Sequence, residues 1–176
     1  MNSDTSHKAS SNGSLAFYWY GLAVVVVLLD QYTKGLASSG LDYGHPVRLL
    51  SWFNLTLQHN TGAAFSFLND AGGWQRFFFT GVATIISVGL VVWLYRMMRG
   101  QRLLALSLGL ILGGALGNLW DRIELGYVVD FISVHYRGHY FPAFNIADSA
   151  ISVGAALMLL DSFLVKGMSK ESEEER

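Results

Sequence analysis

Asp130 and Asp148 are the pair of side chains in this sequence best placed to do chemistry. They stand on either side of one short segment, residues 131–147, in a chain that is otherwise strongly apolar. An ionisable residue at the edge of hydrocarbon is costly to keep and is by default a candidate functional site. Two converging carboxyl groups in a low dielectric cannot readily both ionise, so this pair would share one proton and could activate water.

The composition identifies the surroundings of these carboxylates as a lipid bilayer. Of 176 residues, 52% are hydrophobic and 14% are charged, whereas soluble domains carry roughly 25% charged residues. A net charge of −1 provides no basic field for nucleic acid. The chain has no cysteine, which excludes thiol catalysis, thiolate metal sites and disulfides.

Four stretches reach the roughly 20 mostly apolar residues that a membrane-spanning helix requires. They predict spans at about residues 15–37, 77–95, 103–120 and 144–165. The expected fold is therefore an all-α membrane protein with a single membrane-embedded domain over residues 15–165. Polar residues 1–14 are expected to be disordered, and residues 166–176 are expected to form a solvated tail.

The connection between the second and third spans predicts the orientation of the chain. Residues 96–102 contain three arginines, Arg96, Arg99 and Arg102. Lys and Arg near helix ends are retained on the cytoplasmic side. Both termini are then cytoplasmic, and Asp130 faces outward.

The first span has two interpretations. A cleaved signal peptide fits an apolar run followed by small residues at 37–39. Against cleavage, Asp30 and Lys34 stand four residues apart, which places them on one face of a helix as a favourable pair. We therefore favour a retained membrane anchor.

The outward connections predict a small antiparallel sheet. Residues 53–58 alternate apolar and polar, and residues 59–62 have turn chemistry before a second apolar stretch at 63–68. Residues 128–136 are rich in β-branched and aromatic side chains, and Arg137-Gly138 predicts a hairpin turn before residues 139–141. Non-helical backbone near the membrane is tolerated where it packs on protein. This sheet is therefore expected to roof a cleft between the helices.

The third span carries small residues and a polar end. Gly109, Gly113 and Gly117 recur every four residues with Gly114 beside them, which indicates close helix packing. Polar side chains that are three and four residues apart can cluster at the outer end of this helix: Asn118, Asp121 and Arg122.

Each aspartate of the pair also has a simpler interpretation. Asn145 and Asp148 have the spacing of a helix N-cap and an acidic third position, and this structural reading is as well supported as the functional one. Asp130 lies between apolar residues, where its alternative role is to pair with Arg122 or Arg137.

Five stretches together resemble the lipoprotein signal peptidases, also called signal peptidase II, which are aspartic proteases of the bacterial inner membrane. They occur in family order over nearly the whole chain: Asp30-Gln31-Tyr32-Thr33-Lys34, Asn60-Thr61-Gly62-Ala63-Ala64-Phe65, Gly113 to Arg122, Gly126 to Phe131, and Phe144-Asn145-Ile146-Ala147-Asp148.

The resemblance implies a four-helix enzyme with an extracytoplasmic sheet that cradles the site. It implies removal of the signal peptide from prolipoproteins just before a diacylglyceryl-modified cysteine. We expect a monomer that needs neither cofactor nor metal. Carried over by position, Asp130 and Asp148 are the catalytic pair. A second set of positions matches residues that bind substrate or support the site: Asn60, Gly62, Asn118, Arg122 and Asn145. A third set matches structural polar residues: Asp30, Lys34 and Asp121.

Other functions fit the sequence less well. His135 and His139 are four residues apart, but no Glu follows the first and Gly138 favours a turn, so a zinc protease is disfavoured. The sequence contains no Gly-x-Ser-x-Gly motif, which disfavours a serine hydrolase. The strongest rival is a small transporter whose acids relay protons or cations, which would place those acids along one path through the membrane.

Overall fold

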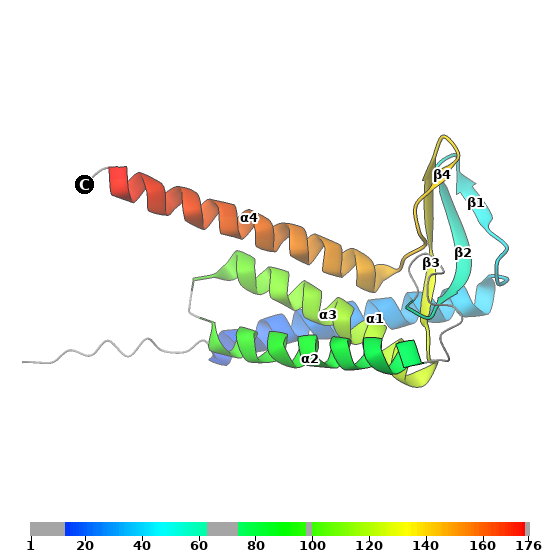
Figure 1. The fold of residues 1–176 in the computed structure, drawn as a ribbon, viewed down its shortest axis with the longest axis horizontal. Coiled ribbons are helices and arrows are strands. Elements are labelled where there is room, and N and C mark those ends of the chain that lie inside the picture. Colours follow the sequence, from blue (N-terminus) through cyan, green and yellow to red (C-terminus); the bar gives the residue numbers. More distant parts are fainter. Residues whose placement is uncertain (1–12, 63–73, 98–99, 175–176) are drawn as a thin grey trace, which may run out of the picture.

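Four long helices and a small sheet make up the computed structural model, which describes residues 13–62, 74–97 and 100–174 (Figure 1). The helices are α1 (Gly13–Gly40), α2 (Trp74–Arg96), α3 (Arg102–Glu124) and α4 (Ile146–Glu174). Each contains a segment that is long and apolar enough to cross a membrane, which confirms the four predicted spans. Most of the N-terminal segment predicted to be disordered, and the strand predicted at 63–68, lie outside the described residues.

Helices α1 and α2 extend one to three residues beyond their predicted ends, and the bounds of α3 and α4 differ more. Helix α3 continues past Trp120 to Glu124. Helix α4 begins at Ile146 rather than at Phe144, because the backbone of Phe144 pairs with that of Ile132 through hydrogen bonds of 2.8 and 3.0 Å. At its other end α4 extends to Glu174, so the tail expected from residue 166 onward is mostly helical.

Helix α3 is the centre of the bundle. Over half of its most apolar 18-residue stretch is buried (56%), compared with 22% or less of the corresponding stretch in each of the other three helices. It packs against α1, α2 and α4. The apolar core lies around its first half, where Leu94 of α2 and Leu108 and Leu112 of α3 are almost inaccessible.

The glycines of α3 permit this close packing, as predicted. A Cβ at Gly109 would lie 3.1 Å from the Trp19 carbonyl oxygen, and one at Gly113 would lie 2.6 Å from Val26 Cβ, so both face α1 without room for a methyl group. Gly114 abuts the backbone of Ala147 on α4 instead. Small residues therefore bring α1 and α4 close to α3 on two neighbouring faces.

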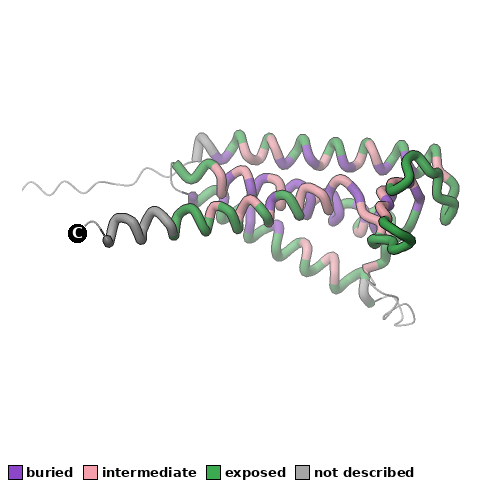
Figure 2. The backbone as a smooth tube through the Cα atoms, turned by 90° about the horizontal axis from the view of Figure 1, so that it is seen from above, coloured by how far each residue is buried: buried purple, intermediate pink, exposed green. Residues whose placement is uncertain are grey.

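The outer faces of the helices expose large apolar side chains, as expected of a surface in contact with lipid. Phe17 of α1, Phe77 of α2 and Phe163 of α4 are all more than 70% exposed. Figure 2 shows this pattern, with buried residues concentrated along the inner faces and exposed residues along the periphery. In water such a surface would be a strong aggregation hazard.

A four-stranded antiparallel sheet lies across one end of the bundle (Figure 1). Its spatial order follows the chain: β1 (Val47–Leu50), β2 (Phe53–Asn60), β3 (Val128–Tyr136) and β4 (His139–Tyr140). Arg137 and Gly138 both have positive φ and form the predicted tight turn between β3 and β4. The prediction missed β1, and it wrongly placed His59 and Asn60 in a turn, whereas they end β2.

The pairing of β2 with β3 contains one irregularity that positions the site. Leu55 is opposite Ile132, but Gln58 is opposite Asp130, so the register shifts by one residue between these pairs. Such a bulge moves the following side chains to the other face of a strand. Asn60, rather than its neighbour His59, thereby shares a face with Asp130.

Candidate active site

Asp130 lies in β3, buried, between two side-chain amides. Its Oδ2 accepts a hydrogen bond from Asn60 Nδ2 (3.0 Å), and its Oδ1 accepts one from Asn145 Nδ2 (2.8 Å). The backbone N–H of Gly62 donates to Asn60 Oδ1 (2.8 Å), which turns the amino group of Asn60 towards the carboxyl group. The partners of Asp130 are therefore neutral donors.

The burial of Asp130 raises its pKa from 3.8 to about 7. The largest cause is the loss of solvent around the carboxylate, and the charge of Asp148 adds to it. The hydrogen bonds from Asn60 and Asn145 and the charge of Lys34 act in the opposite direction. A carboxyl group in this environment keeps its proton close to neutral pH.

The alternative role of Asp130, as an ion-pair partner for Arg122 or Arg137, is contradicted by the structure. Lys34 forms ion pairs with Asp30 and Asp121, whereas neither Arg122 nor Arg137 forms one with Asp130.

Asp148 stands in the first turn of α4 and forms a reciprocal cap with Asn145. The backbone N–H of Asp148 donates to Asn145 Oδ1 (2.9 Å), and the backbone N–H of Asn145 donates to Asp148 Oδ2 (3.2 Å). The predicted helix cap is thus confirmed. The cap does not exclude a chemical role, because the side chain of Asn145 simultaneously reaches Asp130. One residue therefore connects the two aspartates.

Asn118 of α3 holds the other oxygen of Asp148. Its Nδ2 donates to Asp148 Oδ1 (2.7 Å). Its Oδ1 accepts from Lys34 Nζ (3.0 Å) and from Asn145 Nδ2 (3.2 Å). Because an ammonium group can only donate, Lys34 fixes which end of the Asn118 amide faces Asp148.

Arg122 lies one turn further along α3, at the edge of this cluster. Its Nη1 donates to the Asn118 carbonyl oxygen (3.2 Å), and its guanidinium carbon is 5.8 Å from the centre of the Phe79 ring of α2. Arg76 of α2 donates to the carbonyl oxygens of Arg122 (3.0 Å) and Ile123 (2.8 Å). These bonds hold the outer ends of α2 and α3 together.

A buried charged group lies beneath the amides. Lys34 Nζ is 2.7 Å from Asp30 Oδ2 and 2.9 Å from Asp121 Oδ2, so the helical pair expected between Asp30 and Lys34 is present. Gln31 belongs to the same group, since its Nε2 donates to Asp121 Oδ1 (2.7 Å). No role was predicted for Gln31 from the sequence, and its position beside Asp30 was the available signal.

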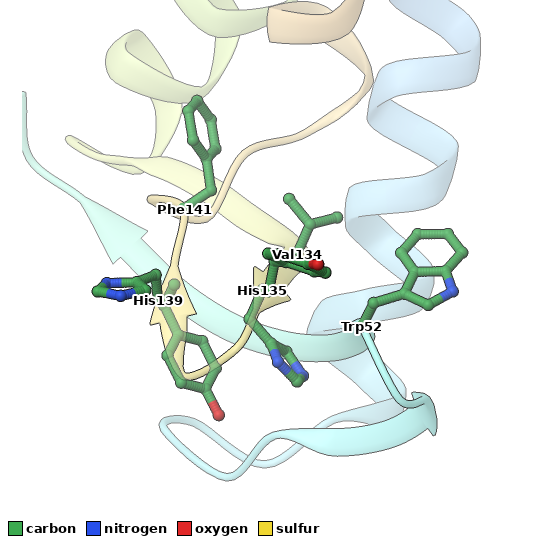
Figure 3. A pocket seen from close by; sticks show the side chains of 7 residues that line it. Trp52, Val134, His135, His139 and Phe141 are labelled. Carbon is green, nitrogen blue, oxygen red and sulfur yellow. The ribbon is translucent and has the colours of Figure 1, made fainter.

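His135 and His139 lie elsewhere, at the outer tip of the sheet. With Trp52, Tyr140 and Phe141 they line an open, mostly apolar pocket of about 480 Å³ (Figure 3). The two imidazole rings point in different directions in Figure 3, and the ring of His135 stacks on Tyr140 at 4.7 Å. His135 is five residues from Asp130 along β3, a separation of roughly 16 Å at 3.3 Å per residue. These histidines are therefore remote from the aspartates.

The family model of signal peptidase (SPase) II matches residues 22–164 of this chain. The chain belongs to the signal peptidase II family. That match spans the polar side chains around the two aspartates, and it establishes the chain as a membrane-embedded peptidase. The transporter interpretation is thereby set aside.

Similar bacterial proteins support the same family. The chain is 55% identical over 162 residues to a lipoprotein signal peptidase of Acinetobacter baumannii, and the match covers 89% of this chain and 92% of that protein. It is 54% identical over 155 residues to a lipoprotein signal peptidase of Teredinibacter turnerae, covering 88% and 92%.

Solved structures show the same arrangement of helices and sheet. A bacterial membrane enzyme determined by the in meso method at 2.3 Å resolution is 31% identical, with a TM-score of 0.74, and the match covers 93% of this chain and 96% of that one. A second such structure, at 1.9 Å, gives a TM-score of 0.72. The all-helical membrane bundle with a small antiparallel sheet is therefore confirmed.

Proposed function

We propose that this chain is an intramembrane aspartic endopeptidase that removes the signal peptide from diacylglyceryl-modified prolipoproteins. The cut falls immediately before the lipid-modified cysteine. The observation that carries the proposal is the position of Asn145, which hydrogen-bonds Asp130 through its side chain and Asp148 through its backbone. Family membership and relatives described as lipoprotein signal peptidases support the substrate class.

The environments of the two aspartates suit different roles in water activation. Burial raises the pKa of Asp130 to about 7, so this residue holds the shared proton. Asp148 accepts hydrogen bonds from Asn118 and from the N-cap, and the first turn of a helix favours a negative charge. Asp148 therefore acts as the base and Asp130 as the acid.

The reaction then proceeds without a covalent intermediate. Asp148 takes a proton from water as the water oxygen bonds to the scissile carbonyl carbon, while Asp130 donates its proton to the carbonyl oxygen. When the tetrahedral intermediate collapses, the C–N bond breaks and the cysteine nitrogen receives the proton from Asp148. A hydroxyl of the intermediate returns a proton to Asp130, and both carboxyl groups regain their initial states.

The remaining polar residues support this pair or bind the substrate. Asn60, Asn118 and Asn145 orient the two carboxyl groups and offer amides to an extended peptide backbone. Gly62 holds Asn60 in position, and Arg122 adds positive charge at the edge of the site. The acyl chains of the substrate remain in the bilayer, which supplies part of the orientation that catalysis needs.

The proposed setting is the bacterial inner membrane, with the aspartates on the periplasmic side. Figure 1 places the α2–α3 connection and the C-terminal end of α4 at the end of the bundle opposite the sheet. Arginines flank that connection, which assigns it to the cytoplasm. Both termini are then cytoplasmic, and the enzyme works as a monomer without metal or cofactor.

The deciding experiment measures cleavage by purified protein in detergent. The substrate is a prolipoprotein that carries the diacylglyceryl group, and mass spectrometry identifies the new N-terminus. The wild type is expected to release the signal peptide, leaving the modified cysteine first, and to leave an unmodified precursor uncut. Asp130→Asn and Asp148→Asn are expected to be inactive although both variants remain folded. Substantial cleavage by either variant, or ion flux in vesicles without cleavage, would refute the proposal.

A further inference from the structure

The residue immediately before each aspartate of the pair is held by a different buried carboxylate. The backbone N–H of Ala147, which precedes Asp148, donates to Asp30 Oδ1 (2.9 Å). The backbone N–H of Val129, which precedes Asp130, donates to Asp121 Oδ2 (3.0 Å). Asp30 belongs to α1 and Asp121 to α3, so two helices that do not carry the pair hold the backbone beside it.

Lys34 joins these two carboxylates. Its ammonium group is 2.7 Å from Asp30 Oδ2 and 2.9 Å from Asp121 Oδ2. All three side chains are nearly inaccessible, at 0% for Asp30, 3% for Lys34 and 2% for Asp121. The backbones of β3 and α4 are therefore connected through a rigid bridge from one carboxylate to the other.

The third hydrogen bond of Lys34 reaches the pair by another route. Nζ donates to Asn118 Oδ1 (3.0 Å), and Asn118 Nδ2 donates to Asp148 Oδ1 (2.7 Å). An ammonium group has three N–H donors, and here each has an acceptor. Lys34 thus influences both the backbone positions of the aspartates and the orientation of the amide that binds Asp148.

We propose that Asp30, Lys34 and Asp121 form a positioning clamp that sets the separation and orientation of Asp130 and Asp148. The inference rests on the proposed function of that pair and adds a role for residues that do not touch the substrate. Without the clamp, α4 and β3 could shift relative to each other although both elements remain formed. Displacements of about 1 Å in a catalytic site can cost roughly a hundredfold in rate.

A purely structural role makes a different prediction. Buried ion groups often contribute little net stability, because desolvation offsets their attraction, and removal of one partner leaves an uncompensated charge. If the three residues only hold the fold together, their substitution lowers the melting temperature while the folded fraction keeps the wild-type kcat and pH profile. A positioning role lowers kcat in protein that is folded and alters the pH dependence of the rate.

The test compares graded substitutions by kcat, KM and pH profile, measured well below each melting temperature. Asp30→Asn and Asp121→Asn keep an oxygen that can accept the backbone N–H but lose the charge, whereas Asp30→Ala and Asp121→Ala lose both. The asparagine variants are expected to lose kcat roughly tenfold and the alanine variants roughly a hundredfold, with little change in KM. Asp42→Asn is the matched control, because Asp42 is exposed just beyond the end of α1, and it should behave as the wild type.

A triple variant separates stability from positioning. The combination of Asp30→Asn, Lys34→Met and Asp121→Asn removes the charge of all three side chains. Replacing a whole buried ion group by neutral residues often restores the stability that is lost when one partner alone is removed. We expect a melting temperature above that of the Lys34→Met single variant, yet a kcat that stays low. Wild-type kcat and pH profile in the folded triple or single variants would overturn the clamp. Failure of Asp30→Asn, Asp121→Asn and the triple variant to fold would also overturn it, since the group would then serve the fold alone.

The outcomes distinguish this inference from the function on which it rests. Activity in Asp130→Asn or Asp148→Asn refutes the catalytic pair itself. If Asp130→Asn and Asp148→Asn are inactive but the variants of Asp30, Lys34 and Asp121 are fully active, only the clamp is refuted.

Discussion

The side-chain amide of Asn145, the residue immediately before helix α4, donates to Asp130 Oδ1 across 2.8 Å. The same residue caps that helix through Oδ1, which accepts the backbone N–H of Asp148 at 2.9 Å. Asn145 thus holds the start of a helix against a strand and binds both Asp130 and Asp148.

The two roles of Asn145 can be separated by Asn145→Ser. Serine caps helices about as well as asparagine, but it has no amino group to reach Asp130. We expect the melting temperature to fall only slightly and kcat to fall by up to about tenfold, since a hydrogen bond between neutral groups contributes roughly 0.5–1.5 kcal/mol. Thermal unfolding and cleavage assays on the same preparation measure both. Wild-type kcat in Asn145→Ser, together with reduced kcat and stability in the uncapped Asn145→Ala variant, would show that the cap alone matters.

Gly62 is expected to tolerate no side chain. Its φ is +97°, and a Cβ would lie within 2.5 Å of Phe79 Cε2. Gly62→Ala should be destabilised by roughly 1–3 kcal/mol from backbone strain alone, and the displaced loop should draw Asn60 away from Asp130. Gly44→Ala is the control, because Gly44 also has a positive φ (+74°) but has open space around it. A drop in cleavage for Gly62→Ala and none for Gly44→Ala is the expected result; similar activity in both would contradict it.

The stability of the protein should depend on pH through Asp130. Its folded-state pKa is about 7 and its ordinary value is 3.8, so the folded chain keeps a proton that the unfolded chain has released across that interval. The stabilisation is fully present below about pH 4 and is lost as pH rises through about 7. Asparagine mimics the protonated form at every pH.

Melting temperatures of the wild type and of Asp130→Asn should therefore diverge with rising pH. The wild type should lose stability relative to the variant between about pH 4 and pH 7, the interval between the ordinary and the folded-state pKa of Asp130. The wild-type cleavage rate should fall over the upper part of the same range as the acid is lost. A constant difference between the two melting curves would contradict the raised pKa.

Gly117 is expected to be intolerant of alanine for a different reason. A Cβ there would lie 2.6 Å from Asp30 Oδ2, so a methyl group would push the carboxylate away from Lys34. Both the melting temperature and kcat should fall in Gly117→Ala. Gly21→Ala provides the comparison, since Gly21 lies in α1 with nothing within 4 Å of the position that a Cβ would occupy, and it should retain both properties.

The absence of cysteine makes the orientation directly testable. Asp42→Cys, beyond the outer end of α1, should react with a membrane-impermeant maleimide in intact cells. Gln101→Cys, at the start of α3, should react only after the inner membrane is permeabilised. Both positions are exposed, so accessibility rather than burial decides the result. The reverse pattern would invert the proposed topology.

The sequence alone was sufficient for the parts of this protein that depend on local pattern. Apolar segments long enough to cross a bilayer require helices, because every backbone polar group must be satisfied in lipid. The four-residue spacing of Gly113 and Gly117 predicted the close helix packing that the structure shows. The spacing of Asn145 and Asp148 likewise predicted a cap, since its bonds form within one turn.

The relationships that assemble the site depended on long-range geometry. The one-residue bulge in β2 places Asn60 beside Asp130, but the sequence of residues 55–58 does not indicate where the register shifts. Likewise, the bonds from Asp30 to Ala147 and from Asp121 to Val129 join residues whose meeting depends on how α1, α3 and α4 pack. Pattern specifies which residues form a helix or a strand, whereas only the packing of these elements determines which buried donor finds which acceptor.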